Sequence, residues 1–247
     1  MKFLQKINFS TLLFLLFASP AWAQVVTIVT EEYPPYNYQD PGSKKILGMS
    51  TEVVQEAFKR AKVDYTIGIY PWARAYQMAQ ETPNVLIYSI GRNATREHLF
   101  KWVDIIAPYD VYLFRLASRP EIAVADIADL KKFKIGAVRD DVRAQYLDKK
   151  GVGMDLVSKD GLNAKKLASE TIDLFPIDEL AMVALYKREG LDPSSVVKVF
   201  KLNELSAGLY VAFSQQTDDR LVHKIKTALE QMKSDGTYDK ICAKYLK

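Results

Sequence analysis

The stretch "STEVVQEAFKRAKVDYTIGIY", residues 50–70, decides the fold class because it joins a helix directly to a strand. In its first part, apolar residues recur at the three- and four-residue spacing of one helix face. Residues 63–70 are rich in β-branched and aromatic side chains and predict a strand. A helix followed at once by such a strand is typical of βαβ units. The apolar face of the predicted helix consists of Val53, Val54, Ala57, Phe58 and Ala61.

The same alternation continues on both sides of this stretch. Further strands are predicted at 25–30, 85–90, 109–116, 133–138, 171–178 and 208–213. Helices are predicted at 72–81, around 126–131, 141–150 and 179–189, and at 218–236, where Gly236 ends an amphipathic pattern. The sequence therefore predicts two α/β lobes, each with a mainly parallel sheet flanked by helices.

Composition narrows the class of protein. The 247 residues are 49% hydrophobic, which is enough for packed cores and too much for a disordered chain. Lys and Arg number 34 against 30 Asp and Glu, and the two signs alternate along the chain. Nucleic-acid binders concentrate their basic residues on one face, so we expect no nucleic-acid partner.

The N-terminus has the organisation of an export signal. Lys2 and Lys6 precede an apolar run, and Ala21-Trp22-Ala23 matches a cleavage site. We expect residues 1–23 to be a signal peptide cleaved after Ala23, which places the mature protein in the periplasm. The alternative is an uncleaved anchor, but the apolar run is shorter than the roughly 20 residues that a spanning helix needs. With Cys242 as its single cysteine, the chain can form no internal disulfide.

Several motifs together resemble a known family. They are "EEYPPYNY", "RNATRE" followed by "FKWVD", "ADLKKFKIGAV", "TIDLFPIDE" and, near the C-terminus, "ALEQMKSDGTYDKICAKYL". The chain resembles the periplasmic solute-binding proteins of the polar amino acid type that serve ABC importers, the bacterial extracellular solute-binding proteins of family 3. "YPWARAY" and "VRDDV" are similar to a divergent subgroup whose ligands are less well defined.

This resemblance implies a type II periplasmic binding protein fold with the ligand in a cleft between two lobes. Lobe one would comprise residues 24–108 and 208–247, and lobe two residues 112–204. The hinges would lie near 107–111 and 203–207. Such a protein is monomeric, needs no cofactor or metal, and delivers its ligand to an ABC permease or presents it to a membrane receptor.

The resemblance also implies a site on lobe one. Arg96 holds the position of the arginine that binds the ligand carboxylate, and its guanidinium offers two parallel donors to such an anion. The alternative for Arg96 is a helix cap or a surface pair with Glu97 or Asp104. Ser89 would lie beside the ligand, whereas Gly91 stands where many members have a further hydroxyl. Arg92 is left open between the cleft and the surface.

Aromatic walls and a further arginine complete the expected lobe-one side. Tyr33 and Trp72 match the two rings that hold the ligand, with ordinary core packing as the alternative for each. Arg74 would lie close to Trp72 in the first turn of the same helix, facing an acidic ligand, Glu31 or Glu32, or solvent.

Lobe two is expected to contribute acidic residues. Asp178 matches the acid that receives the ligand ammonium, although it could instead cap the following helix, and both roles can coexist. Asp140 and Asp141 replace a Gly-Thr-Thr type turn that binds the carboxylate in amino acid binders. These acids either meet a cation or polar donor of the ligand or point toward a nearby arginine: Arg139, Arg143 or Arg74. A plain α-amino acid ligand is therefore in doubt.

Enzymatic classes find little support in the sequence. The chain has only two histidines and no G-x-S-x-G motif, which argues against common hydrolases. It has no glycine-rich phosphate loop, which argues against nucleotide enzymes. One rival is a periplasmic lyase of the cyclohexadienyl dehydratase type on the same fold, with a cleft carboxylate as general acid. We expect a binding protein for a small polar, carboxylate-bearing ligand, not an enzyme.

Overall fold

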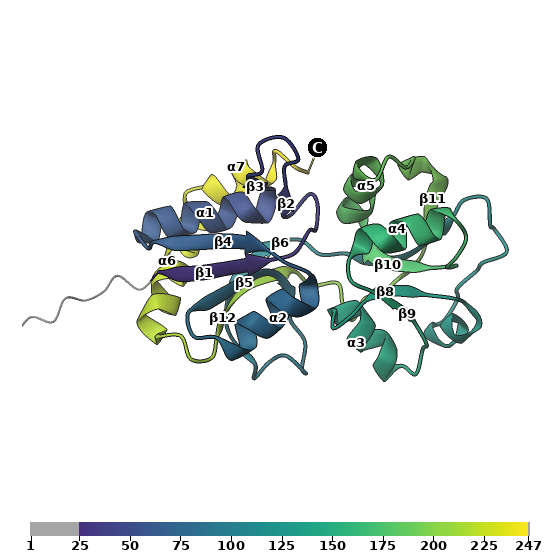
Figure 1. The fold of residues 1–247 in the computed structure, drawn as a ribbon, viewed down its shortest axis with the longest axis horizontal. Coiled ribbons are helices and arrows are strands. Elements are labelled where there is room, and N and C mark those ends of the chain that lie inside the picture. Colours follow the sequence, from purple (N-terminus) through teal and green to yellow (C-terminus); the bar gives the residue numbers. More distant parts are fainter. Residues whose placement is uncertain (1–24, 247) are drawn as a thin grey trace, which may run out of the picture.

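A computed structural model describes residues 25–246, which form two α/β lobes lying side by side (Figure 1). The expected signal peptide, residues 1–23, lies outside the described residues. Within residues 25–246, no helix combines the length and the apolar character needed to cross a membrane.

Lobe one is built on a five-stranded sheet with the strand order β4-β1-β5-β12-β6. Strand β1 pairs in parallel with β4 and β5, whereas β12 runs antiparallel to β5 and β6. The strands are β1 (Val26–Thr30), β4 (Tyr65–Ile69), β5 (Val85–Gly91), β6 (Phe100–Ala107) and β12 (Leu209–Ser214). A small hairpin, β2 (Tyr38–Gln39) with β3 (Ile46–Leu47), follows β1.

Helices cover both faces of this sheet. Side chains along each strand alternate between the two faces, and apolar side chains on each face pack against helices. Leu86 of β5 packs with Phe58 of α1 (Met49–Ala61) and Leu229 of α6 (Asp219–Ser234). Ile87, the next residue of β5, packs on the other face with Ala75 of α2 (Trp72–Glu81). The short helix α7 (Thr237–Cys242) lies beside α1 and ends the chain's regular structure (Figure 1).

Lobe two has a three-stranded antiparallel sheet in the order β10-β7-β11 and a parallel pair, β8 with β9. A bridge between Ile135 and Leu174 connects these two parts. The strands are β7 (Val111–Leu116), β8 (Gly136–Val138), β9 (Asp155–Val157), β10 (Phe175–Asp178) and β11 (Val196–Lys201). The helices are α3 (Val142–Lys149), α4 (Asp160–Ala168) and α5 (Glu179–Arg188), with 3₁₀ turns η1 (Ile127–Lys132) and η2 (Pro193–Ser195).

The two-lobed α/β organisation is confirmed, but the sheets are mixed and not mainly parallel. The reason is the path of the chain, which leaves lobe one after β6 and returns after β11. The returning strand β12 enters lobe one between β5 and β6 and antiparallel to both. Strands β6, β9 and β11 and helix α4 are not among the predicted elements.

The chain passes between the lobes twice, at residues 108–110 between β6 and β7 and at residues 202–208 between β11 and β12. Both segments lie at the expected hinge positions. Hinge movement at these two segments stays a prediction.

Candidate ligand-binding site

The Arg96 guanidinium is fully buried where the two lobes meet. Its Nη1 donates to the Gly91 carbonyl oxygen at 2.9 Å, and its Nη2 donates to the Asp140 carbonyl oxygen of lobe two at 2.8 Å. Its Nε has no acceptor, and no carboxylate lies within ion-pair distance of Arg96, among residues 25–246. Burial lowers the pKa of Arg96, against the opposing effect of Asp141. The alternative of a surface pair is therefore wrong, and a buried cation is left without a counter-ion among the described residues.

Two aromatic rings hold this guanidinium. Its central carbon lies 5.3 Å from the centre of the Trp72 ring and 4.8 Å from that of Tyr76. Trp72 is the first residue of α2, and its ring stacks on Tyr76 with centroids 5.6 Å apart. Only 2% of Trp72 is exposed, and its indole N–H has no acceptor in the described part of the chain. The Trp72 ring thus lies against Arg96, and the indole N–H of Trp72 is a donor without an acceptor among the described residues.

Tyr33 follows β1 and lies at the boundary with lobe two. Its ring stacks on Tyr36 at 5.4 Å, and the guanidinium carbon of Arg143, from lobe two, lies 5.6 Å from its centre. The Tyr33 hydroxyl is buried and has no hydrogen-bond partner among residues 25–246. Like Trp72, Tyr33 combines ring packing with an unused polar group.

Ser89 occupies an irregular position in β5. Tyr88 pairs with Val211 and Ile90 with Tyr210, so Ser89 is an extra residue that bulges from the ladder. Its φ is 57°, in the left-handed region that non-glycine residues rarely adopt. Its hydroxyl is buried and unpaired within the described residues. Backbone conformations of this kind cluster at functional sites, where the surrounding structure maintains them.

Gly91 lies opposite lobe two. A Cβ built on Gly91 would lie 2.9 Å from Cγ1 of Val142, the first residue of α3. The missing side chain therefore does more than remove a hydroxyl donor, because it lets the start of α3 approach β5.

A buried ionic cluster forms the opposing wall of lobe two. Arg143 donates from Nε to Asp141 at 2.5 Å, from Nη2 to Asp160 at 2.9 Å and from Nη1 to the Pro176 carbonyl oxygen at 3.1 Å. Burial raises the pKa of Asp141, but Arg143 outweighs it and the net shift is downward. The alternative that an acid of the "VRDDV" segment points at a nearby arginine is confirmed for Asp141 and Arg143.

Glu31 follows β1 in lobe one and faces this cluster. Asn37 fixes its backbone by donating from Nδ2 to the Glu31 carbonyl oxygen at 2.7 Å. Only 6% of Glu31 is exposed, and its carboxylate has no hydrogen bond or ion pair among the described residues. Burial, Asp160 and Asp141, in that order, raise the pKa of Glu31 well above its ordinary value.

Asp178 is held by donors of the protein itself. Its Oδ1 accepts from the Tyr36 hydroxyl at 2.6 Å and from the Ala181 amide at 3.1 Å, and its Oδ2 accepts from the Asp110 amide at 2.8 Å. The helix-capping alternative is thus confirmed, since Asp178 is the N-cap of α5. A ligand ammonium at Asp178 would have to share these oxygens with three donors.

The other two arginines lie toward the surface. Arg92 pairs with Glu97 at 2.5 Å and packs its guanidinium over Trp102 and Tyr210, which settles it as a surface residue. Arg74 is exposed and lies over the Tyr70 ring at 5.1 Å. It lines an open depression at the rim of the cleft together with Asp140 of lobe two, and it pairs with neither Glu31 nor Glu32 in the described residues.

Contacts across the rim hold the two lobes together in this structure. Arg188 of lobe two pairs with Glu32 of lobe one at 2.6 Å and donates to the Gln39 carbonyl oxygen at 3.0 Å. On the opposite rim, Lys149 contacts Thr95. Together with the bond from Arg96 to Asp140, these contacts define a closed cleft.

A cavity of about 180 Å³ remains between the lobes. Its lining combines lobe one and lobe two: Glu31, Glu32, Ile69, Tyr70, Pro71, Trp72, Ser158 and Lys159. Glu31 and Trp72, whose carboxylate and indole N–H have no partner within the described residues, border this cavity, whereas Arg96, Ser89 and Tyr33 are not among its lining residues.

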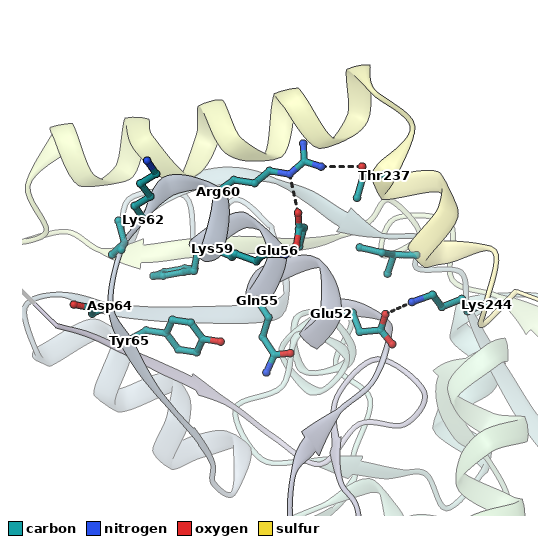
Figure 2. A pocket seen from close by; sticks show the side chains of 13 residues that line it. Glu52, Gln55, Glu56, Lys59, Arg60, Lys62, Asp64, Tyr65, Thr237 and Lys244 are labelled. Atoms are coloured by element: carbon teal, nitrogen blue, oxygen red, sulfur yellow. Dashed lines mark hydrogen bonds and ion pairs between the residues drawn. The ribbon is translucent and has the colours of Figure 1, made fainter.

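A second, open groove lies on the outer surface of lobe one. Figure 2 shows that it runs along α1 and α7, where Arg60 binds Glu56 and Thr237, and Lys244 binds Glu52. Within residues 25–246, no polar side-chain atom that lines the groove is buried without a hydrogen-bond partner, whereas Trp72 Nε1, Ser89 Oγ and Arg96 Nε of the cleft are. The cleft is therefore the better candidate for a small-molecule site.

The family model of bacterial extracellular solute-binding proteins, family 3, matches residues 25–247. The chain belongs to this family. No protein with curated function matches the chain by sequence.

Solved structures with this fold extend the comparison. A histidine kinase sensor domain with similarity to periplasmic binding proteins matches with a TM-score of 0.79 and 19% identity, over 90% of this chain and 95% of that one. An ancestral arginine-binding protein bound to arginine matches with a TM-score of 0.78 and 21% identity, over 90% and 98%. The arginine-, lysine-, histidine-binding protein ArtJ from Geobacillus stearothermophilus matches with a TM-score of 0.77 and 18% identity, over 90% and 95%. At these identities the likeness establishes the type II periplasmic binding protein fold.

Sequence reasoning missed part of the site. Arg143 was considered only as a neighbour of the two aspartates, and Asp160 not at all. Asp160, the first residue of α4, is 1% exposed and accepts a hydrogen bond from Arg143. A signal existed in the pattern, because an acid at a helix start after a strand is a common position for a cleft residue in α/β lobes.

Proposed function

We propose that this solute-binding protein captures a small polar, carboxylate-bearing ligand, an amino acid or a related compound, in the cleft and delivers it to an ABC importer. The observation that carries the proposal is the fully buried Arg96, which has no carboxylate partner among the described residues. A buried charge is costly unless it is paired. A ligand carboxylate at Arg96 removes that cost.

Neighbouring groups support an acceptor-rich ligand. The Arg96 Nε, the Trp72 indole N–H and the hydroxyls of Ser89 and Tyr33 are buried and unpaired within residues 25–246. Buried donors in folded proteins are normally satisfied, so these unpaired donors support a ligand that supplies their acceptors. Tyr33 and Trp72 serve as walls. Direct contact with the ligand stays a prediction for Asp178, for Arg74 at the rim and for Asp141, which is already paired with Arg143.

The expected location is the periplasm, and the expected working form is a monomer that needs no cofactor. The family is one of binding proteins, which favours capture of the ligand over a lyase reaction. Incubation with prephenate or arogenate tests the lyase alternative, because turnover of either compound would overturn a pure binding role.

A sensory role is the second candidate function. The observation that favours it is the similarity to a histidine kinase sensor domain. In that case the loaded protein docks on a membrane receptor and not on a permease. Genes for a permease and an ATPase beside this one support import, whereas a gene for a sensor kinase supports signalling.

A thermal-shift screen of amino acids, small organic acids, amines and peptides tests the proposal, because a ligand that binds only the native state raises the melting temperature. Arg96→Ala should then weaken binding of the identified carboxylate by at least about tenfold, since each hydrogen bond to a charged group contributes roughly 1.5–3 kcal/mol. Arg92→Ala is the matched control, because Arg92 is paired at the surface. Full affinity in the Arg96 variant would exclude Arg96 as the anion site.

A further inference from the structure

One arginine of lobe two reaches across the cleft rim into lobe one. Arg188 is the last residue of α5, and its Nη2 lies 2.6 Å from Oε1 of Glu32 and donates to the Gln39 carbonyl oxygen at 3.0 Å. Its guanidinium carbon also lies 5.4 Å from the centre of the Tyr38 ring. A carboxylate, a carbonyl and an aromatic face of lobe one therefore hold one cation of lobe two.

The lobe-one side of this contact is fixed by bonds of its own. The two carboxylate oxygens of Glu32 accept from the Gln39 amide at 3.1 and 3.4 Å, and Tyr38 and Gln39 form strand β2 of the hairpin. Because Glu32 is already tied to the hairpin, binding Arg188 requires little further ordering of its side chain. The side chains of Arg188 and Glu32 are each 29% exposed, so water and salt screen their attraction only in part.

The other polar contacts described across the cleft have a neutral acceptor. Lys149 contacts the Thr95 hydroxyl, and Arg96 donates to the Asp140 carbonyl oxygen. Among residues 25–246, the pair of Arg188 with Glu32 is the one ion pair that joins the two lobes. It is therefore the interlobe contact that the loss of a charge or the addition of salt should weaken most.

We propose, on the basis of the binding function above, that Arg188 is a clasp that stabilises the closed cleft with or without a ligand and slows ligand release. All of its partners belong to the protein, so these contacts form without help from a ligand. A ligand adds to closure through its own differential affinity for the closed form. Arg188 acts through the closure of the lobes, which makes it a positioning residue.

The neighbouring Lys187 provides a matched control. It carries the same charge on the same turn of α5, is exposed, and forms no ion pair in the described part of the chain. Glu189, on the other side of Arg188, pairs with Lys165 at 2.8 Å. Arg188→Gln and Lys187→Gln thus remove the same charge, but Arg188→Gln alone removes a contact between the lobes.

Small-angle X-ray scattering of the ligand-free proteins tests the clasp. In about 0.1 M NaCl, Arg188→Gln should have a larger radius of gyration than wild type, and Lys187→Gln should match wild type. Glu32→Gln breaks the same pair from lobe one and should reproduce the increase. The double variant of Arg188 and Glu32 should open no further, because the two changes remove one shared contact.

Equal radii of gyration in wild type, Arg188→Gln and Glu32→Gln overturn the inference. If one of the two single variants fails to fold, as its melting curve would reveal, the variant on the opposite lobe decides.

Salt gives a readout on the unmodified protein. The Debye length falls from about 10 Å in 0.1 M salt to about 3 Å in 1 M salt, which weakens a partly exposed ion pair. The radius of gyration of wild type should increase over this range, and that of Arg188→Gln should change less. An equal response of the two proteins contradicts a clasp that rests on the charge of Arg188.

The release of a bound probe gives the functional readout. Wild type is titrated with L-arginine, L-glutamine and L-glutamate, and stopped-flow fluorescence measures the dissociation rate of each compound that binds. Arg188→Gln should release it at least about threefold faster, because loss of the clasp favours opening, whereas Lys187→Gln should stay within about twofold of wild type. An unchanged dissociation rate in Arg188→Gln overturns the role in retention and leaves the binding function intact.

The two proposals fail in different ways. If neither these probes nor any compound of the thermal-shift screen binds, the proposed binding function fails, and scattering still decides whether Arg188 closes the lobes. If a probe binds but neither its release nor the radius of gyration responds to Arg188→Gln, the clasp alone fails.

Discussion

The two walls of the cleft carry similar residue types but differ in how these are satisfied. On the lobe-two wall, Arg143 is bonded to two carboxylates and a carbonyl, and Asp178 holds three donors. On the lobe-one wall, Arg96 is bonded to carbonyls alone, and Trp72 and Ser89 have unpaired polar atoms within the described residues. Burial is nearly complete on both walls, so exposure does not explain the difference.

The difference indicates that the two lobes have different roles in ligand binding. The Arg143 cluster is bonded within lobe two except at Asp160 Oδ1, whereas on the proposed function the ligand supplies partners for the polar groups of lobe one. Lobe one is therefore the expected first contact for the ligand, and lobe two then closes over it. The variants below test this difference in hydrogen bonding between the two walls through stability and ligand affinity.

The largest expected effect is that of Arg143→Met on stability. Removing the guanidinium leaves Asp141 and Asp160 buried without a counter-ion, and breaking such buried pairs costs about 3–5 kcal/mol. Urea unfolding measures this loss. Arg92→Met, at an exposed pair, should cost at most about 1 kcal/mol. An Arg96→Met protein that loses as much stability as Arg143→Met would contradict the contrast between the walls.

A smaller effect is expected from Gly91→Ala. The added Cβ would lie 2.9 Å from Cγ1 of Val142 across the cleft, and a β-branched side chain has little freedom to move away. Overpacking costs about 1–3 kcal/mol, so ligand affinity should fall by about fivefold or more in calorimetric titrations. The double variant with Val142→Ala should recover most of the affinity. If it does not, the lobes do not close at this contact.

The pH profile of stability tests the unpaired Glu31. Its pKa lies well above the ordinary value of 4.5, first through burial and then through Asp160 and Asp141. Folding therefore takes up a proton between the two values. The stabilising contribution of Glu31 is complete below about pH 4.5 and is lost as the pH rises through the folded value. Relative to Glu31→Gln, ligand-free wild type should lose at most about 1.4 kcal/mol per pH unit in this window. Parallel stability curves of the two proteins would contradict the assignment.

The smallest expected effect is that of Trp72→Phe. The ring remains against Arg96, but the indole N–H is lost, and a neutral hydrogen bond to the ligand contributes about 0.5–1.5 kcal/mol. Affinity measured by calorimetry should fall by a factor of about two to ten. Trp102→Phe is the control, because its indole N–H donates to the Glu97 carbonyl outside the cleft. Equal losses in both variants would argue against a ligand contact at Trp72.

Much of the fold could be predicted from local periodicity. The helix and strand expected in residues 50–70 are α1 (Met49–Ala61) and β4 (Tyr65–Ile69). Strands β6 and β11 were not predicted, because what defines them is pairing with strands distant in sequence, β12 and β7. The same long-range pairing made the sheets mixed.

The candidate site could be predicted only in part. Trp72 lies at the start of α2 and packs against Arg96, whose position the family motif predicted, whereas the ligand contacts of Arg96, Trp72, Tyr33 and Ser89 stay predictions. The ionic cluster depends on α3 and α4 both packing against β8, which places Asp160 at Arg143 across 17 residues of sequence. No spacing rule for a single helix or strand contains that contact.

The position of Asp178 has a mechanical consequence. It joins Tyr36 of lobe one, the start of α5 and the Asp110 amide in the connection between the lobes, so it lies at the pivot of any rotation of one lobe against the other. Displacement grows with the length of the lever arm from that pivot. Thr95 and Lys149, which meet at the rim, are far better positions than the surroundings of Asp178 for a pair of fluorescent labels that report opening.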